Sequence, residues 1–301
     1  MTAGDRAGGT YWDGVWRNAE IIAPADPGIT GRNNYVERRF AEFFRHALGD
    51  GKGKKLLEVG AANSAWLPYF AIHQGFNVAG LDYSDGGCAQ ARAVLQRAGV
   101  AGTITCADMF DPPEALVGAF DSVVSFGVVE HFERVEDAVR AVATFCSPGG
   151  IVATVVPNMT GLIGALQRRL NEPVFRLHVP LDPPRLAAAH AAAGLRIDTA
   201  SYFIATDFGV VNLDGLPGGV STRRKHAVLR WVVRLSKAAW VLEERLGMRF
   251  PATRSFAPYV VVVGRRPGAR SALAGSRSSA AAEPQLGASG PAGSSTSSGP
   301  A

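Results

Sequence analysis

A short apolar run that ends in an acid, a glycine and small residues limits most strongly what this chain can fold into. The run Leu56-Leu57-Glu58-Val59 leads into Gly60-Ala61-Ala62-Asn63-Ser64, and apolar residues then recur at spacings of three and four. This pattern predicts a buried strand, a tight turn and a helix. Because Gly60 and the two alanines carry almost no side chain, the turn lets a ligand approach the backbone closely.

The next predicted strand ends in an acid. It runs over 76–81 and is followed by Asp82, roughly 20 residues past the glycine turn, where a carboxylate can accept hydrogen bonds from ribose hydroxyls. A dinucleotide-binding turn would have the spacing G-x-G-x-x-G. Only the first of those glycines, Gly60, is present, so we do not expect a pyrophosphate cradle.

The segment from 54 to 155 alternates between strands and helices. Strands are predicted at 55–59, 76–81, 103–106, 120–125 and 150–156, and helices at about 64–74, 86–98 and 135–146. This alternation favours a parallel sheet with helices on both faces. Ligands of such sheets bind at the carboxyl ends of the strands. Glu58, Gly60, Asp82, Asp108 and Phe126 all follow or end a strand there.

These motifs, in this order, resemble those of the class I S-adenosylmethionine-dependent methyltransferases. Glu58 and Gly60 match the first motif of the family, whereas Ala62 and Ser64 stand where it has later glycines; Pro148-Gly149-Gly150 matches the turn before the fifth strand. The resemblance covers about 55–265. It implies an α/β, Rossmann-like, doubly wound sheet of seven strands whose last strand is antiparallel, with S-adenosyl-L-methionine as the cofactor.

The resemblance also implies which residues hold the cofactor. Asp82 would bind the ribose, Asp108 would accept from the adenine amino group, and Met109 would pack on the adenine ring. A helix cap or a turn is the structural alternative for Asp108. The expected cofactor-binding residues are Glu58, Gly60, Ala61, Ala62, Asp82, Tyr83, Asp108, Met109 and Phe126.

Two histidines are candidate catalytic residues. Glu130-His131 resembles part of an E-x-x-E-H cluster that the quinone-pathway O-methyltransferases assign to a divalent metal, but Gly127 stands where the first acid would be, so we expect no metal. His131 is then a general base, a substrate-orienting residue or a structural histidine. His178, in an insertion after the fifth strand, is a second candidate base; its alternative role is a loop histidine bonded to the backbone.

Aromatic residues before the first strand are candidates for covering the substrate. Tyr11, Trp12 and Trp16 precede an amphipathic helix at 35–48, and Asn158 falls at the end of the fifth strand. We expect these four residues to contact the substrate. The alternative for the aromatic residues is that they pack that helix onto the sheet.

The expected organisation has three parts. Residues 1–50 form an N-terminal helical lid, 51–266 the methyltransferase domain with helical insertions at about 159–185 and 206–256, and 267–301 a disordered tail rich in Ser, Ala, Gly and Pro. In the first insertion a helix at 159–170 should close at Asn171-Glu172-Pro173, with 176–181 extended.

A helix at about 222–247 lies in the second insertion. Its predicted apolar face contains Val228, Trp231, Val232, Leu235, Ala239, Leu242 and Leu246, with basic residues mostly opposite. We favour a helix that covers its own domain. It could instead cap the substrate site, form a dimer face or rest on a membrane.

Composition limits the cellular setting and the partners. The formal charge is +5, but no basic tract is interleaved with aromatics, so nucleic acid is not an expected partner. Three cysteines without C-x-x-C spacing suit a reduced cytoplasmic protein and not a disulfide framework or a zinc site. Met1 to Gly9 lacks the apolar stretch of a signal peptide, and no apolar window is long enough to span a bilayer.

The expected function is methyl transfer to a small-molecule acceptor, in bacterial secondary metabolism. Membrane contact is open but not favoured, and the oligomeric state is not decided. One alternative is an enzyme of the same fold that uses the cofactor for aminopropyl transfer or cyclisation. The other is a non-catalytic cofactor-binding or membrane-associated protein.

Overall fold

The computed structural model describes residues 4–17 and 19–268. Residues Met1–Pro267 form one compact unit. The tail predicted at 267–301 lies outside the described residues apart from its first two positions.

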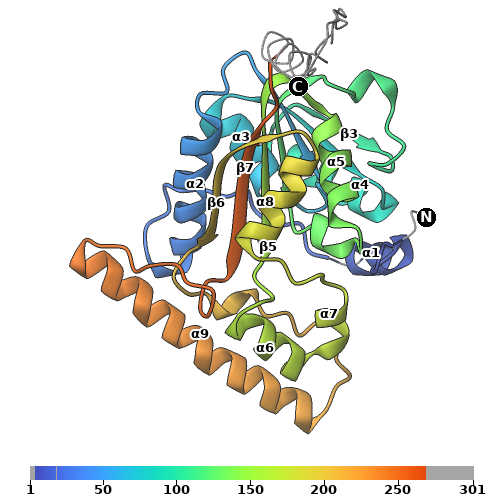
Figure 1. The fold of residues 1–301 in the computed structure, drawn as a ribbon. Helices are drawn as coiled ribbons and strands as arrows, with labels where there is room; N and C mark the ends of the chain where they lie inside the picture. Colours follow the sequence, from blue (N-terminus) through green and yellow to red (C-terminus); the bar gives the residue numbers. More distant parts are fainter. Residues whose placement is uncertain (1–3, 18, 269–301) are drawn as a thin grey trace, which may run out of the picture. The chain divides into compact units, whose positions relative to one another are not determined.

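A seven-stranded sheet runs through this unit in the order β3-β2-β1-β4-β5-β7-β6 (Figure 1). β7 is antiparallel to both of its neighbours, and the pairs from β3 to β5 are parallel. This confirms the predicted Rossmann-like sheet with an antiparallel last strand. The strands are β1 (Lys55–Val59), β2 (Asn77–Asp82), β3 (Gly102–Cys106), β4 (Phe120–Phe126), β5 (Cys146–Pro157), β6 (Arg196–Phe203) and β7 (Tyr259–Arg265).

Helices cover both faces of the sheet, so the strand residues are buried on both sides. One core contains residues of α2 (Tyr35–Leu48), α3 (Trp66–Gln74) and α4 (Asp85–Ala98). The other contains residues of α5 (Val135–Thr144) and α8 (Pro183–Ala192). Neighbouring strand residues such as Leu56 and Leu57 belong to opposite cores, which explains the continuous apolar runs of the sequence.

Short 3₁₀ helices connect several of these elements. They are η1 (Arg32–Asn34), η2 (Glu114–Leu116), η3 (Val129–His131) and η4 (Phe208–Val210). At the N-terminus, α1 (Gly9–Arg17) precedes a long irregular segment that leads to α2.

The first insertion contains two helices and not the predicted helix followed by an extended segment. After α6 (Leu162–Leu170) the chain forms α7 (Glu172–Arg176), with Pro173 in its first turn. The sequence Asn171-Glu172-Pro173 predicts an end to helical structure, but proline fits the first turn of a new helix because no backbone hydrogen bond is lost there. The Asn171 amide, which donates to the carbonyls of Asn212 and Asp214, holds the junction between the two helices.

The second insertion contains α9 (Val220–Leu246), which shares an apolar cluster with α6 and η4 (Figure 1). Its buried face is not the predicted apolar face. The buried residues are Ser236, Trp240 and Glu243, whereas most of the predicted face is exposed: Val228, Trp231, Leu235, Leu242 and Leu246. Within the described part of the chain, neither α9 nor any other helix has the length and apolar character needed to cross a membrane.

The cysteines also differ from expectation. Cys88 on α4 and Cys106 at the end of β3 are joined by a disulfide, with their Cα atoms 6.0 Å apart, and Cys146 is buried and free. An odd number and the absence of C-x-x-C spacing do not exclude a pair that the packing of a helix on its strand brings together.

Candidate functional site

A cavity of about 480 Å³ lies at the carboxyl ends of β1, β2 and β4, under residues of α1. The sequence analysis predicts that the ligand binds at this edge of the sheet. Of the expected cofactor residues, seven line the cavity: Gly60, Ala62, Asp82, Tyr83, Asp108, Met109 and Phe126.

The turn after β1 presents backbone to the cavity. Gly60 has a φ of +74°, a conformation that favours glycine, and a Cβ there would collide with the side chain of Val128. The N–H groups of Gly60 and Ala61 donate to the Leu81 carbonyl at 2.8 and 3.2 Å, which ties the turn to the end of β2. Ala61 itself is fully buried and does not line the cavity.

Glu58 lies beneath this turn and not on the cavity wall. Its carboxylate accepts from the Ser64 hydroxyl at 2.7 and 2.8 Å, and burial raises its pKa to about 8. The Ser64 oxygen in turn accepts from the backbone N–H groups of Trp66 and Leu67. Ser64, which replaces a family glycine, therefore joins the buried acid to the start of α3.

Asp82 is the carboxylate that faces the cavity. Its oxygens accept from the backbone N–H groups of Ser84 at 2.9 Å and Ala62 at 3.1 Å, which fixes the carboxyl plane. Burial raises the pKa of Asp82, and these backbone hydrogen bonds oppose that rise. Gly87 lies against the same carboxylate, since a Cβ at that position would come within 2.9 Å of Asp82 Oδ1.

Residues after β3 form another part of the wall. Met109 is buried, and Asp108 Oδ1 accepts from the N–H of Phe110 at 2.9 Å, as in a tight turn. The N–H of Ala107 donates to the Asp82 carbonyl at 3.0 Å. The two acids are thus held on adjacent strands at one edge of the sheet.

Aromatic side chains of α1 cover the cavity. Trp12 and Trp16 both line it and stack at 5.9 Å, and Trp12 meets the His131 ring edge to face at 5.1 Å. The helix is held in place by Asp13, which accepts from the Ser84 hydroxyl at 2.6 Å. Tyr11 does not line the cavity.

Sequence reasoning missed four wall residues from the N-terminal segment: Asp5, Gly9, Thr10 and Asp13. Asp5 accepts from the Tyr83 hydroxyl at 3.0 Å, and Gly9 lies against the Tyr83 ring. The only sequence signal for these four residues was that they lie close to Tyr11, Trp12 and Trp16 along the chain. No periodicity marks polar residues that meet the site through tertiary contacts.

Asn158 does not reach the cavity. It is fully buried, and its amide donates to the carbonyls of Arg254 and Ala257, both at 2.9 Å. Its side-chain oxygen accepts from the N–H and hydroxyl of Thr160. The expected substrate contact is therefore replaced by a bond between the end of β5 and the segment before β7.

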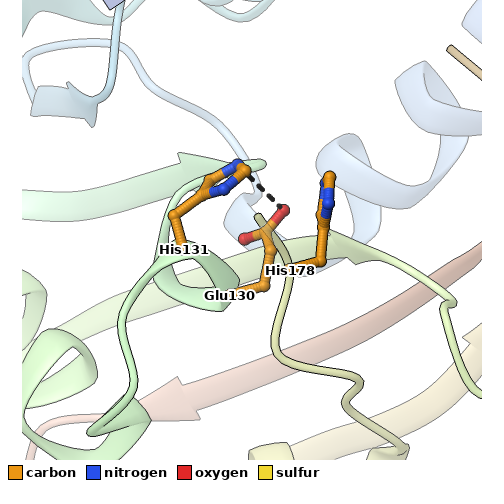
Figure 2. Close-up of side chains that lie close together, drawn as sticks. All are labelled: Glu130, His131 and His178. Atoms are coloured by element: carbon orange, nitrogen blue, oxygen red, sulfur yellow. Dashed lines mark ion pairs between the residues drawn. The ribbon is translucent and has the colours of Figure 1, made fainter. Parts of the chain in front are cut away.

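His131 lines the cavity, while Glu130 and His178 lie beside it (Figure 2). Burial, with a smaller effect of His178, lowers the pKa of His131 to about 3, and burial lowers the pKa of His178. Both imidazoles are therefore neutral at physiological pH. Burial raises the pKa of Glu130 to about 8.

Comparisons with known proteins agree with this geometry. A family model described as a methyltransferase domain matches residues 57–154. Over 100 residues the chain is 32% identical to a ubiquinone biosynthesis O-methyltransferase of Chromobacterium violaceum, an alignment that spans 33% of this chain and 43% of that relative.

Solved structures resemble the chain at low identity, which shows the fold alone. Geranyl diphosphate C-methyltransferase from Streptomyces coelicolor A3(2), in complex with Mg²⁺, geranyl diphosphate and S-adenosyl-L-homocysteine, has a TM-score of 0.52 at 16% identity, over 84% of this chain and 96% of that one. The [4+2]-cyclase SpnF has a TM-score of 0.56 at 16% identity, over 89% and 98% of the two chains.

Proposed function

We propose that this chain, whose residues 57–154 match a methyltransferase domain, transfers the methyl group of S-adenosyl-L-methionine to a small-molecule acceptor. One observation carries the proposal: the Gly60 turn and the Asp82 carboxylate open into the same cavity, at the strand ends where this fold binds ligands.

The cofactor-binding residues follow from the wall. Asp82, with its carboxyl plane held by two backbone N–H groups, suits the ribose diol. Asp108 and Met109 suit an adenine ring, since one offers an acceptor for the amino group and the other an apolar surface. The sulfonium cofactor supplies an activated methyl group, so the protein must align the acceptor and exclude water.

Residues of this chain are available for both tasks. The indole rings of Trp12 and Trp16 cover the cavity and can exclude water. His131 is the wall histidine, and its Nδ1 lies 3.0 Å from the Leu177 carbonyl oxygen, which can only accept. The ring proton is therefore on Nδ1, and the lone pair of Nε2 can accept a hydrogen bond from an acceptor hydroxyl and orient it; with a pKa of about 3 the ring is a weak base.

A small, partly apolar acceptor is supported by the size of the cavity and by relatives. About 480 Å³ lies within the usual range of small-molecule sites. One relative is named a ubiquinone biosynthesis O-methyltransferase, and one solved structure of the same fold is a geranyl diphosphate C-methyltransferase. We extend this to an acceptor from bacterial secondary metabolism, such as a phenol or a prenyl compound.

The test is calorimetric titration of the purified chain with S-adenosylmethionine and with S-adenosylhomocysteine, followed by turnover with a panel of phenols and prenyl compounds. Micromolar binding of both ligands, and S-adenosylhomocysteine as the coproduct, are the expected results. Methylthioadenosine as the coproduct would instead indicate aminopropyl transfer or cyclisation. Failure of both ligands to bind would refute the proposal.

A further inference from the structure

Three side chains from segments far apart in the sequence point toward one another beside the cavity (Figure 2). Glu130 and His131 follow β4, and His178 follows α7 in the first insertion. One carboxylate oxygen and one ring nitrogen from each histidine all lie within 4.8 Å of one another. Two imidazoles and a carboxylate are a common ligand set for transition metals.

Both histidines are oriented as metal ligands usually are. His131 Nδ1 lies 3.0 Å from the Leu177 carbonyl oxygen, and His178 Nδ1 lies 2.8 Å from that of Val174. A carbonyl oxygen only accepts, so each Nδ1 carries the proton and each Nε2 has a free lone pair. Ligating histidines typically donate their second ring N–H to a backbone carbonyl in this way, which fixes the tautomer and the ring plane.

The carboxylate of Glu130 lacks partners that its burial would otherwise require. Glu130 is 1% exposed, and within the described part of the chain neither of its oxygens has a hydrogen-bond partner beyond a contact with its own backbone N–H. Burying a carboxylate unpaired is costly. His131 Nε2 lies 4.0 Å from Glu130 Oε1, beyond hydrogen-bond distance.

The backbone around the cluster is held independently of any ligand. The N–H of Val179 donates to the Glu130 carbonyl at 2.6 Å, and the N–H of Arg6 donates to the His131 carbonyl at 2.9 Å. The Arg6 guanidinium also donates to the His178 carbonyl at 3.1 Å. Three segments are thus fixed around the cluster, which makes it a preorganised site.

The donor set indicates which ion suits the site. Gly127 lies beside Glu130 and supplies no ligand atom: its φ is +70°, and a Cβ there would be in van der Waals contact with Glu130 Oε1, at 3.7 Å. The donors are therefore one oxygen and two nitrogens, a set that favours Zn²⁺ or a similar ion over Mg²⁺, which prefers oxygen ligands.

From this geometry we propose that Glu130, His131 and His178 bind one divalent transition-metal ion, for which Zn²⁺ is the probe. Metal–ligand distances of about 2.0–2.2 Å require the three side chains to close inward by roughly 1 Å. The inference does not depend on the proposed methyl transfer.

The ion would change how a proton leaves the acceptor. With Nε2 of His131 bound to the ion, that nitrogen no longer accepts a hydrogen bond from the acceptor hydroxyl. An ion next to the cavity wall can instead lower the pKa of an acceptor hydroxyl, which removes the same proton by another route.

The experiment measures metal binding directly, without turnover. The full chain is stripped with EDTA, dialysed and titrated with ZnCl₂ by calorimetry, and CoCl₂ is added separately to record visible absorption. The variants are Glu130→Gln and His178→Gln. His226→Gln is the control, because His226 is exposed on α9, away from the cluster. Far-ultraviolet circular dichroism and urea unfolding, measured on each variant, report whether the chain is folded.

We expect one equivalent of Zn²⁺ to bind, the Co²⁺ complex to show visible bands of a nitrogen-ligated ion, and Mg²⁺ in excess not to compete. Each cluster variant should bind Zn²⁺ at least about tenfold more weakly, and the control should match the wild type. Failure of the stripped wild type to bind Zn²⁺ would overturn the proposal. So would folded cluster variants that bind it as the wild type does.

Discussion

Two acids near the first turn take different positions, and this predicts different effects on the cofactor. Asp82 lines the cavity, whereas Glu58 is buried under the turn with Ser64. Asp82→Asn should weaken S-adenosylhomocysteine binding by roughly tenfold or more, because a hydrogen bond to a charged group contributes about 1.5–3 kcal/mol. Glu58→Gln should change it by less than about threefold. Calorimetry decides, and equal effects of the two changes would contradict the assignment of Asp82 to the ribose.

Gly60 offers a second prediction at the scale of one residue. Gly60→Ala places a Cβ both in a left-handed conformation and against Val128. Gly53 is a matched control, because its φ of +75° is nearly the same and a Cβ there meets nothing within 4 Å. Gly53→Ala should cost about 1–2 kcal/mol of unfolding free energy and leave cofactor binding unchanged.

Gly60→Ala should cost more and should also weaken cofactor binding, because the clash lies on the cavity wall. The double variant Gly60→Ala/Val128→Ala should recover part of the lost stability. Urea unfolding and calorimetry measure the two effects. If Gly60→Ala behaves like Gly53→Ala in both, close packing at the turn is not what requires glycine.

At the scale of elements, two tryptophans of α9 can show which face of this helix packs against the rest of the protein. Trp240 is 4% exposed, stacks on Tyr35 at 5.0 Å and donates from Nε1 to the Thr206 carbonyl at 2.7 Å; Trp231 is 64% exposed. Trp240→Ala should lower the unfolding free energy by about 3–5 kcal/mol. Trp231→Ala should change it by less than about 0.5 kcal/mol. A reversed order in urea unfolding would mean that the predicted apolar face is the packed one.

The same helix shows where sequence patterns stop being informative. Periodicity selects the apolar face, but the packed face contains Ser236 and Glu243, whose polar atoms are satisfied by Phe208 N–H, the Tyr35 hydroxyl and Phe250 N–H. All three partners lie outside α9, and Tyr35 is 208 residues from Glu243, so the periodicity of the helix could not reveal them. The partners of the Asn158 amide, the carbonyls of Arg254 and Ala257, likewise lie far along the chain.

The strands and the first turn were predictable because their signals are local. β1 spans Lys55–Val59 as the apolar run indicates, and α4 begins at Asp85, one residue before the predicted start. Residues that follow parallel strands must meet at one edge of the sheet, so the order of the strands alone brings Asp82 and Asp108 together. The N-terminal wall residues Asp5 and Asp13 could not be predicted in this way, since a long irregular connection separates them from the sheet.

At the scale of the whole molecule, buried acids make stability depend on pH. Burial raises the pKa of Glu58 and of Glu130 to about 8, from ordinary values near 4.5. Between those limits the folded protein binds more protons than the unfolded chain, so the unfolding free energy falls as pH rises and levels off above about 8. The buried histidines affect the pH dependence of the unfolding free energy only below about pH 6.5, because burial lowers their pKa values in the folded protein.

Between pH 6.5 and 8 the unfolding free energy therefore depends mainly on Glu58 and Glu130, because their pKa values are near 8. The unfolding free energy of the chain in EDTA should fall across this range by about 2 kcal/mol for each acid, since one pKa unit corresponds to about 1.36 kcal/mol. Glu58→Gln should remove roughly half of this slope while leaving cofactor affinity nearly unchanged. Urea unfolding at four pH values measures how the unfolding free energy changes with pH in the wild type and in Glu58→Gln. A flat or rising profile would show that the carboxyls of Glu58 and Glu130 are ionised in the folded protein. If added Zn²⁺ flattens the remaining slope in Glu58→Gln, the ion holds Glu130 in its charged form, which links the buried acid to the cluster beside the cavity.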